Sequence, residues 1–274
     1  MNPRVRRIGR RSRSRWRGDG CAHGRQPERR WSGWPVRSCA DWTAAAPSLC
    51  CVATSTIRLL LAGRVPPPGS SSSSTGSRRR HAVNEVFRAA AELQAFCESQ
   101  GWGCCLIGGL AVLRWGEPRE TIDVDLTLFT GFGGEEAYIE KLLARFEARI
   151  ENAAEFALRH RVLLARAQSG VGLDIALGGL PFEELVIERS SLFEYLPKLL
   201  LRTCSAEDLI VLKAFAARQR DWLDLEGVII RQAGTLDWDY VYRQLRPLVE
   251  LKESPEIIHE LERRRRERDH TSGG

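Results

Sequence analysis

The chain has 274 residues, 43% of them apolar, which suits one large domain or two small ones with a sizeable core. Its net charge of +6 is uneven: residues 1–82 hold 17 Arg, no Lys and three acids, a net charge of +14, and the remainder carries −8. The excess of basic charge therefore gives no support for nucleic-acid binding by the acidic remainder. No stretch of 18 or more apolar residues is present, so we expect no membrane partner.

Residues 1–82 show no lasting helical or alternating apolar pattern, apart from the short stretch Ile57 to Ala62. Three interpretations stay open: a disordered basic tail that contacts nucleic acid, a transit peptide, or sequence that is not natural protein. We favour the third, because Arg, Trp, Cys, Ser, Pro and Gly without Lys is what GC-rich upstream DNA encodes when a start codon is placed too early. Met1 is the only methionine, and Val83, where the first clean helical pattern opens, fits an alternative start.

From Val83 onwards the apolar pattern becomes regular and predicts a series of helices and strands. The first helix, with Val86 and Leu93 on its apolar face, is expected to end at Gly101 in the left-handed conformation that glycine adopts at low cost. Further strands are expected, in chain order, over residues 104–107, 121–129, 161–167 and 171–177, with edge pairing over 185–187 and 199–202. Further helices are expected over residues 110–115, 135–149, 153–158, 205–216, 221–231, 238–249 and 255–268.

This order of elements predicts an α/β fold of the α+β type, in which a mixed sheet is flanked by helices and followed by a helical C-terminal part. The expected organisation is a disordered or non-native extension over 1–82, an α/β core over 83–203, the helical part over 204–268 and a flexible tail over 269–274.

The cysteines of the regular region indicate no metal site. They lack C-x-x-C spacing and a nearby pair of histidines, and they are Cys97, Cys104, Cys105 and Cys204. These residues therefore fit buried thiols in the reducing cytoplasm better than zinc ligands, and we expect a cytoplasmic protein.

The alternation around Asp123 and Asp125 is the most informative pattern in the sequence. Ile122, Val124 and Leu126 are expected on one face of a strand, which places both aspartates on the opposite face with their carboxylates close together. Two such charges repel and raise each other's pKa unless a divalent cation neutralises them. Oxygen ligands favour a hard cation, Mg²⁺ or Mn²⁺, that completes its coordination with water and nucleotide phosphates. The alternative is a solvated strand face.

Two further features are expected beside this pair. Gly108 and Gly109 stand at a strand-to-helix junction, where bare N–H groups and the helix dipole favour a phosphate. Asp174 interrupts an otherwise apolar strand, so its carboxylate needs a partner. We expect that partner to be the same metal site, with Asp174 as third ligand and as general base toward an attacking hydroxyl. A buried salt bridge to an arginine such as Arg161 or Arg166 is the competing interpretation.

The order of Gly108-Gly109, Asp123-x-Asp125 and a later strand carboxylate resembles the polymerase-β-like nucleotidyltransferase superfamily. The chain is more narrowly similar to the bacterial AbiEii-like toxin nucleotidyltransferases of abortive-infection systems in residues 107–112, Arg119, Thr121, residues 207–213 and residues 220–224. The resemblance covers residues 83–253. One departure is Gly109, where the superfamily more often has a serine, so that a hydroxyl able to contact a phosphate is missing and the backbone is left to bind it.

The resemblance implies an enzyme that transfers a nucleoside monophosphate from an NTP to an acceptor hydroxyl in the presence of Mg²⁺ and releases pyrophosphate. The implied metal ligands and catalytic residues are Asp123, Asp125 and Asp174. The implied nucleotide-binding residues are Gly108, Gly109, Arg119 and Lys213. Lys213 would contact the triphosphate, and Arg119 would do the same or orient its loop. A pair between Lys213 and a nearby acid is an open alternative.

The acceptor stays open between an RNA or tRNA end, a protein hydroxyl and a small molecule such as an aminoglycoside, and a cognate antitoxin is an expected partner. A second hypothesis is a catalytically inactive protein that keeps the fold and binds a nucleotide or such a partner. We interpret Arg220, Asp221 and Asp224 as a tie between two helices rather than as catalytic groups.

Overall fold

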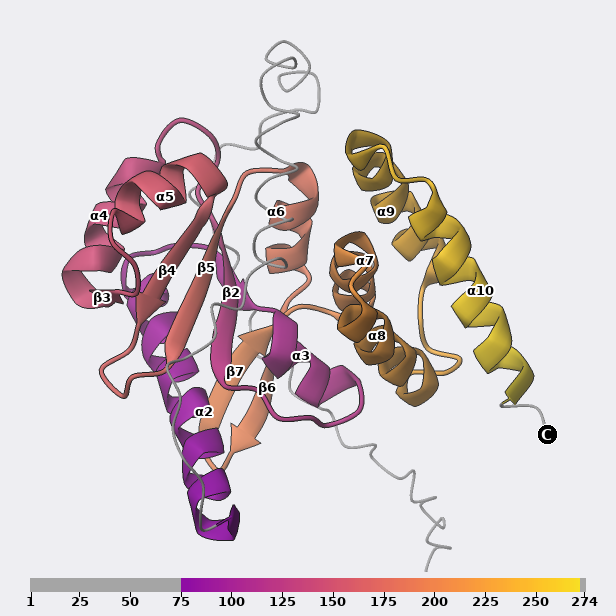
Figure 1. Cartoon of the computed structure of the whole chain (residues 1–274), viewed down its shortest axis with the longest axis horizontal. Coiled ribbons are helices and arrows are strands. Elements are labelled where there is room, and N and C mark those ends of the chain that lie inside the picture. The colour runs from indigo at the N-terminus through magenta and orange to yellow at the C-terminus, as the bar shows by residue number, and fades with distance from the viewer. Residues whose placement is uncertain (1–74, 272–274) are drawn as a thin grey trace, which may run out of the picture. The chain divides into compact units, whose positions relative to one another are not determined.

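The computed structural model describes residues 75–271, with side chains for residues 84–268. The predictions for residues 1–74 and for the end of the tail, residues 272–274, lie outside the described residues. The described part contains a mixed sheet of seven strands with helices on both of its faces (Figure 1). The predicted α/β fold with a mixed sheet, flanking helices and a helical C-terminal part is therefore confirmed.

Strands and helices are interspersed as far as Thr203, and only helices follow. The strands are β1 Cys104–Leu106, β2 Asp123–Phe129, β3 Glu147–Ala148, β4 Val162–Arg166, β5 Gly172–Gly178, β6 Ser191–Leu196 and β7 Leu199–Thr203. The helices are α2 Thr75–Ser99, α3 Gly108–Trp115, α4 Glu135–Arg145, α5 Ala153–His160, α6 Pro181–Glu188, α7 Ala206–Ala216, α8 Gln219–Arg231, α9 Trp238–Lys252 and α10 Glu256–Thr271.

The middle of the sheet brings β2 and β5 side by side. The strand order is β3-β4-β5-β2-β1-β7-β6, in which β2 and β5 run parallel, as do β1 and β7, and the other neighbours are antiparallel. Asp125 on β2 is opposite Asp174 on β5 in the register of this pair. Because both strands have neighbours on both sides, the position of these residues is fixed by hydrogen bonds across the sheet.

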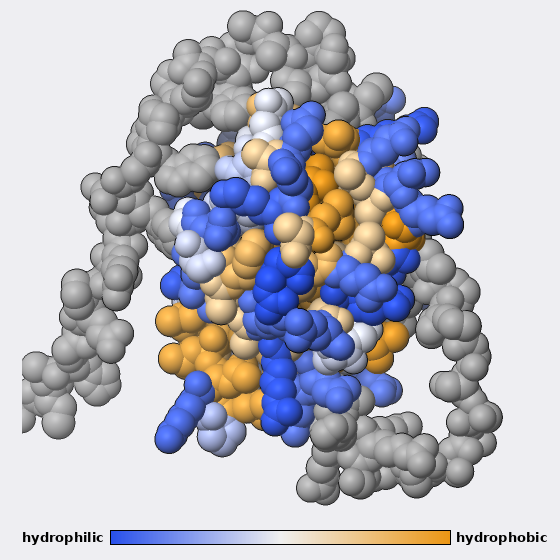
Figure 2. Space-filling model, turned by 90° about the vertical axis from the view of Figure 1, so that its left-hand side faces the viewer, coloured by the Kyte–Doolittle hydropathy of each residue, from blue (hydrophilic) through white to orange (hydrophobic). Residues whose placement is uncertain are grey.

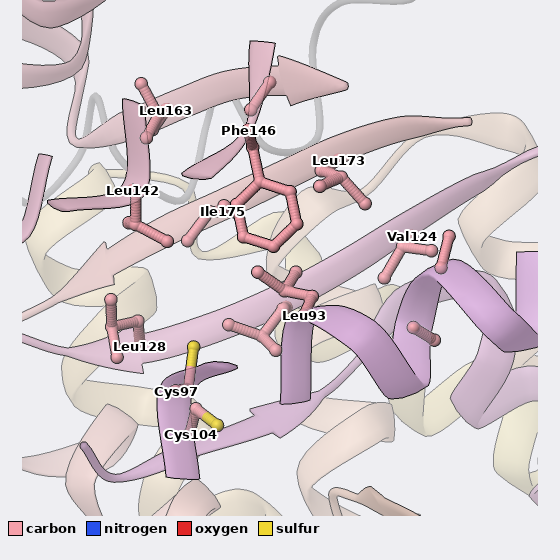
Figure 3. Close-up of a cluster of buried hydrophobic side chains, with 14 of the residues drawn as sticks. Leu93, Cys97, Cys104, Val124, Leu128, Leu142, Phe146, Leu163, Leu173 and Ile175 are labelled. Atoms are coloured by element: carbon pink, nitrogen blue, oxygen red, sulfur yellow. The ribbon is translucent and has the colours of Figure 1, made fainter. Parts of the chain in front are cut away.

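One face of the sheet is covered by α2, α4 and α5. Val124 of β2 and Ile175 of β5 point toward this layer and lie in one apolar cluster with Leu93 of α2 and Leu142 of α4 (Figure 3). Burying each of these side chains stabilises the fold by about 1.5–3 kcal/mol. Since a slip of one residue would turn the whole apolar set into water, the cluster fixes which residues of β2 face the other way.

The opposite face is covered by α3 and α6; α7 packs against α3, and the remaining helices lie beyond α7 (Figure 1). Cys105 of β1 belongs to a second apolar cluster, together with Val186 of α6 and Leu209 of α7. Ser205 caps α7 as predicted, since its hydroxyl accepts a hydrogen bond from the backbone N–H of Asp208 at 3.1 Å. The polar side chains of β2 therefore face the side of the sheet where α3 and α6 pack, and α7 contributes to the cleft on this side.

The structure differs from the predicted elements in several places. Residues 185–187 are not an edge strand but part of α6, which Pro181 opens in its first turn. The sequence did not predict β6, because this edge strand begins with four successive exposed residues and shows no alternation. The first helix begins at Thr75 rather than at residue 83, and α4 ends at Arg145, so that residues 147–148 form the short strand β3.

The four cysteines of the described region are free and buried, as predicted. Burial raises the pKa of the Cys105 thiol far above its ordinary value, which keeps this thiol protonated and unreactive. No helix among the described residues combines the length and apolar character that crossing a membrane requires. On one side of the molecule, hydrophobic residues lie among hydrophilic ones at the surface (Figure 2), as is usual for a folded domain.

Candidate active site

A cleft lies between the sheet and the helical layer, on the face of β2 that carries Asp123 and Asp125. The cleft is partly open to solvent, and its lining combines carboxylates, basic side chains and apolar residues, as ligand sites commonly do. Every residue predicted for catalysis, metal binding or nucleotide binding lines this cleft, namely Gly108, Gly109, Arg119, Asp123, Asp125, Asp174 and Lys213. The structure therefore brings together residues from separate strands, helices and loops.

The three predicted carboxylates lie on the two central strands. Asp125 and Asp174 are direct neighbours across β2 and β5, and Asp123 precedes Asp125 by two residues on the same face. Burial, and then the negative charges of Asp123 and Asp174, raise the pKa of Asp125 to about 7. A nearby positive charge would strongly stabilise the ionised form of this carboxylate, because both its burial and the like charges around it oppose ionisation.

Asp125 also caps helix α3. Its Oδ2 accepts a hydrogen bond from the backbone N–H of Gly109 at 3.3 Å. A β-carbon at Gly108 would lie 2.0 Å from the same oxygen, and the φ of Gly108 is +54°, so only glycine permits this approach. The structure thus differs in one respect from the expectation that this N–H group binds a phosphate, because the N–H of Gly109 donates a hydrogen bond to Asp125.

Thr121, in the loop before β2, positions Asp123. Its hydroxyl donates to the backbone carbonyl oxygen of Asp123 at 3.2 Å and lies 3.4 Å from Oδ1 of the same residue. A β-carbon at Gly109 would lie 2.3 Å from this hydroxyl oxygen. The space that a serine would need at Gly109 is therefore filled by Thr121, which accounts for the departure from the commoner superfamily signature.

Asp174 forms an ion pair with an arginine that the sequence did not indicate. Nη2 of Arg149, the residue that follows β3, lies 2.6 Å from Oδ1 of Asp174. Neither of the two arginines named as examples is the partner, because Arg161 pairs with Glu135 and Arg166 is exposed on β4. Burial raises the pKa of Asp174, and the positive charge of Arg149 opposes this rise only in part. The competing interpretation of a buried salt bridge thus holds for Asp174, with a different partner.

The donor set suits a hard divalent cation, although no complete cage is formed. Carboxylate oxygens are the ligands that Mg²⁺ prefers, and Oδ1 of Asp174 is a buried atom that accepts no well-formed hydrogen bond from the described residues. Within the described part of the chain, no three acidic, His or Cys side chains are gathered closely enough to hold a metal as they stand. Asp123 and Asp125 are thus the best-placed ligands, and Asp174 could join them on leaving Arg149.

Lys213 is buried and shared between two acids of α8. Its Nζ lies 2.7 Å from Oδ1 of Asp221 and 2.9 Å from Oδ2 of Asp224. Asp224 also accepts two hydrogen bonds from Arg119, at 2.5 and 2.7 Å. Burial raises the pKa of Asp224, but the hydrogen bond from Arg119 and the charge of Lys213 outweigh it and hold this pKa below its ordinary value. These ion pairs join α7, α8 and the loop before β2, so the alternative of Lys213 paired with a nearby acid is the arrangement observed.

Some residues that line the cleft were not predicted from the sequence as site residues. Thr127 continues the polar face of β2 two residues beyond Asp125, where the alternation of the strand is expected to place it. Glu183 reaches the cleft from α6, but an acid in the first turn of a helix indicates only a helix start. Arg218 and Arg220, at the junction of α7 and α8, line the cleft as well.

A mixed sheet whose neighbouring strands present carboxylates beside a glycine turn defines the class of protein as nucleotidyltransferase-like. The family model described as nucleotidyl transferase AbiEii toxin, type IV toxin–antitoxin system, matches residues 101–237, half of the chain. The chain belongs to this AbiEii family, as the resemblance of its motifs predicted.

Two solved structures are similar to the chain. An antigenic nucleotidyltransferase-like protein from Paracoccidioides brasiliensis is 15% identical, with a TM-score of 0.40 over 63% of this chain and 94% of that chain. The antibiotic-resistance factor ANT(2'')-Ia is 17% identical, with a TM-score of 0.39 over 65% of this chain and 98% of that chain. No curated protein matches the chain.

Proposed function

We propose that this protein transfers a nucleoside monophosphate from an NTP to an acceptor hydroxyl, as the toxin of a toxin–antitoxin or abortive-infection system. The observation that carries the proposal is that Asp123, Asp125 and Asp174 face one cleft from two adjacent strands. Membership of the AbiEii family supports the reaction class and the toxin role.

Asp123 and Asp125 would hold Mg²⁺ or Mn²⁺, with Asp174 as the third ligand. When bound, the cation supplies positive charge that neutralises the phosphates and makes the reacting phosphorus more electrophilic. The chain holds both ligands in place beforehand, since Asp125 accepts a hydrogen bond from Gly109 and Asp123 is held by Thr121. Groups fixed in this way need little rearrangement during the reaction, which favours catalysis.

Asp174 is the proposed general base. The oxygen of the acceptor hydroxyl forms a bond to the α-phosphorus, the bond between the α-phosphorus and the bridging oxygen breaks, and pyrophosphate leaves with that electron pair. The hydroxyl proton passes to the carboxylate of Asp174. Asp174 suits this role because it lies directly opposite Asp125 in the register of β2 and β5 and lines the same cleft.

The triphosphate is proposed to lie against the wall where α7 and α8 meet. This wall carries Lys213, Arg218 and Arg220. Lys213 is already paired with two acids, so it contributes less positive charge to a phosphate than an unpaired lysine would. The Arg218 side chain is 43% exposed and also contacts Asp221, at 3.2 Å. Arg218 and Arg220 are proposed as phosphate contacts in addition to Lys213, because they line the same wall of the cleft.

The acceptor is proposed to be an RNA or tRNA end, a protein hydroxyl or a small molecule. Because the chain after residue 82 has a net charge of −8, a large nucleic acid would need a local basic patch, which the arginines of the α7–α8 junction supply. A cognate antitoxin is the proposed protein partner, on the basis of the family.

The test is transfer of label from each of the four α-³²P-labelled NTPs to RNA, to protein and to aminoglycosides in the presence of Mg²⁺. We expect one acceptor class to be labelled by the native chain and Asp125→Asn to lower the rate at least about a hundredfold. Asn retains an oxygen that accepts the hydrogen bond from Gly109, so the fold is preserved. Asp239→Asn, on an exposed position of α9, is the matched control and should transfer label like the native chain.

A second candidate, a catalytically inactive protein that binds a nucleotide or a partner, is favoured by one observation. Arg149 engages the carboxylate that would serve as general base. If this candidate is correct, the native chain binds NTPs but labels no acceptor, and Asp125→Asn is equally inert with all four nucleotides.

A further inference from the structure

The inner end of the cleft holds two polar side chains to which the proposed reaction gives no part. Thr127 lies about 7 Å beyond Asp125 along β2, on the same face. Glu183 reaches this place from α6 and is only 5% exposed. A β-carbon at Gly178 would lie 3.2 Å from the Cβ of Glu183 and 3.4 Å from the hydroxyl oxygen of Thr127, so both side chains border the same small space.

One oxygen of Glu183 is fixed and the other is available. Oε2 accepts hydrogen bonds from the backbone N–H groups of Gly179 and Leu180, each at 2.8 Å. The described residues donate no hydrogen bond to Oε1. A nearly buried carboxylate oxygen that is held rigidly in a cleft wall without a donor is suited to accept a hydrogen bond from a ligand.

The surroundings of Glu183 indicate which part of a ligand lies there. The cleft is also lined by the apolar residues Ile107, Val186, Leu209 and Leu212, which pack in one cluster, and Val186 lies one turn after Glu183 on α6. The arginines that suit phosphates belong instead to the α7–α8 junction, and the negative charge of Glu183 repels a phosphate. A flat, weakly charged ring that carries a hydrogen-bond donor fits an apolar wall with one acceptor better than a phosphate or a sugar rich in hydroxyls.

We propose that this inner end is the base-binding subsite, in which Glu183 accepts a hydrogen bond from the exocyclic amino group of the nucleotide base and Thr127 supplies a second hydrogen bond. The inference rests on the proposed function, which requires an NTP in this cleft. Adenine, cytosine and guanine carry such an amino group. Uracil carries two carbonyl oxygens around a single N–H group, and their lone pairs are repelled by a carboxylate. The subsite therefore selects an amino-bearing NTP against UTP.

The experiment measures the dissociation constants of ATP, CTP, GTP and UTP for the full chain by calorimetry in the presence of Mg²⁺. We expect the preferred amino-bearing NTP to bind at least about tenfold more tightly than UTP. In Glu183→Gln one oxygen can still accept from Gly179 and Leu180, while the amide NH₂ faces the cleft in place of Oε1. This variant should lose at least about tenfold in affinity for the preferred NTP and gain affinity for UTP, whose carbonyl oxygen accepts from the amide.

Two further variants separate binding from folding. Glu184→Gln changes an exposed neighbour on α6 and should leave all four dissociation constants unchanged. Thr127→Val replaces the hydroxyl by a methyl group and leaves the cap of α6 intact. It should weaken the binding of the preferred NTP about threefold or more.

The outcomes distinguish this proposal from the proposed function. Unchanged dissociation constants in both Glu183→Gln and Thr127→Val, or UTP as the nucleotide that the native chain binds most tightly, overturn the base-binding subsite while the nucleotidyltransferase proposal stands. Failure of the native chain to bind any of the four NTPs overturns both proposals.

Discussion

A β-carbon at Gly109 would lie 2.3 Å from Oγ1 and 2.8 Å from Cβ of Thr121, so the glycine and the threonine occupy complementary space. Thr121 is 5% exposed, and its hydroxyl contacts Asp123. A side chain at residue 109 and the threonine at residue 121 therefore exclude each other. Because Thr121 contacts the proposed metal ligand Asp123, the position of Asp123 depends on a glycine at residue 109.

This relationship predicts the effect of restoring the commoner signature. Gly109→Ser forces its side chain into Thr121, so we expect a loss of about 1–3 kcal/mol in the free energy of unfolding and a strong loss of label transfer. The double variant Gly109→Ser with Thr121→Gly removes both short contacts, the one with Oγ1 and the one with Cβ, and should regain part of the stability. Urea unfolding of the three chains checks this; a single variant as stable as the native chain contradicts the assigned packing.

The ion pair between Arg149 and Asp174 predicts a competition. Because the guanidinium and a divalent cation would share one carboxylate, Arg149→Ala should bind Mn²⁺ about tenfold more tightly than the native chain in the absence of nucleotide. Electron paramagnetic resonance of a Mn²⁺ titration measures this. Arg166→Ala, an exposed arginine on the adjacent strand β4, is the control and should leave the affinity unchanged. Weaker Mn²⁺ binding by Arg149→Ala would show that the arginine only supports the structure.

We expect a substitution of Lys213 to affect the stability of the fold more than the binding of a nucleotide. Lys213→Met leaves Asp221 and Asp224 buried without this partner, and we expect about 3–5 kcal/mol of destabilisation in urea unfolding. Lys198→Met changes an exposed lysine in the turn between β6 and β7 and should leave the stability unchanged. A native-like free energy of unfolding for Lys213→Met would mean that its ion pairs do not hold α7 and α8 together.

The pair between Glu135 and Arg161 predicts a dependence of stability on pH. Both side chains are buried; burial raises the pKa of Glu135, but hydrogen bonding and the charge of Arg161 outweigh it and lower this pKa below the ordinary 4.5. The ionised pair therefore stabilises the fold above that value, and the contribution is lost as the pH falls through the lowered pKa.

The comparison of the native chain with Glu135→Gln isolates this contribution. Buried carboxyls with raised pKa values, such as Asp208, change the stability with pH in the opposite direction, but their contribution is the same in both chains and cancels in the difference. The difference in the free energy of unfolding should shrink between about pH 6 and about pH 3. A difference that stays constant over this range contradicts the assigned pair.

The site was predictable from the sequence where it depends on local spacing. A strand turns alternate residues to one face, so the positions of Asp123 and Asp125 follow from the apolar residues between them. The placement of Asp174 followed from a lone carboxylate in an apolar strand that had to pair in the sheet.

Other features were not predictable because they depend on contacts between distant segments. Nothing in the spacing of Arg149 indicates that it reaches Asp174, because this contact exists only once β3, β4 and β5 lie side by side. The apolar residues 185–187 suited a strand as well as a helix. The hydrogen bonds by which Glu183 caps α6 favour the helix. The same cap brings Glu183 into the cleft, which a pattern of helix starts does not reveal.

The central claim is that the carboxylates of β2 and β5 converge on a cation beside a bound nucleotide. Its most direct test is a crystal structure of the chain with Mn²⁺ and a non-hydrolysable NTP, in which anomalous scattering locates the metal. We predict a peak at about 2.2 Å from oxygens of both Asp123 and Asp125, with Asp174 turned from Arg149 toward the metal and the nucleotide. A nucleotide bound in the cleft with Mn²⁺ elsewhere, or with no metal at these carboxylates, would contradict the account.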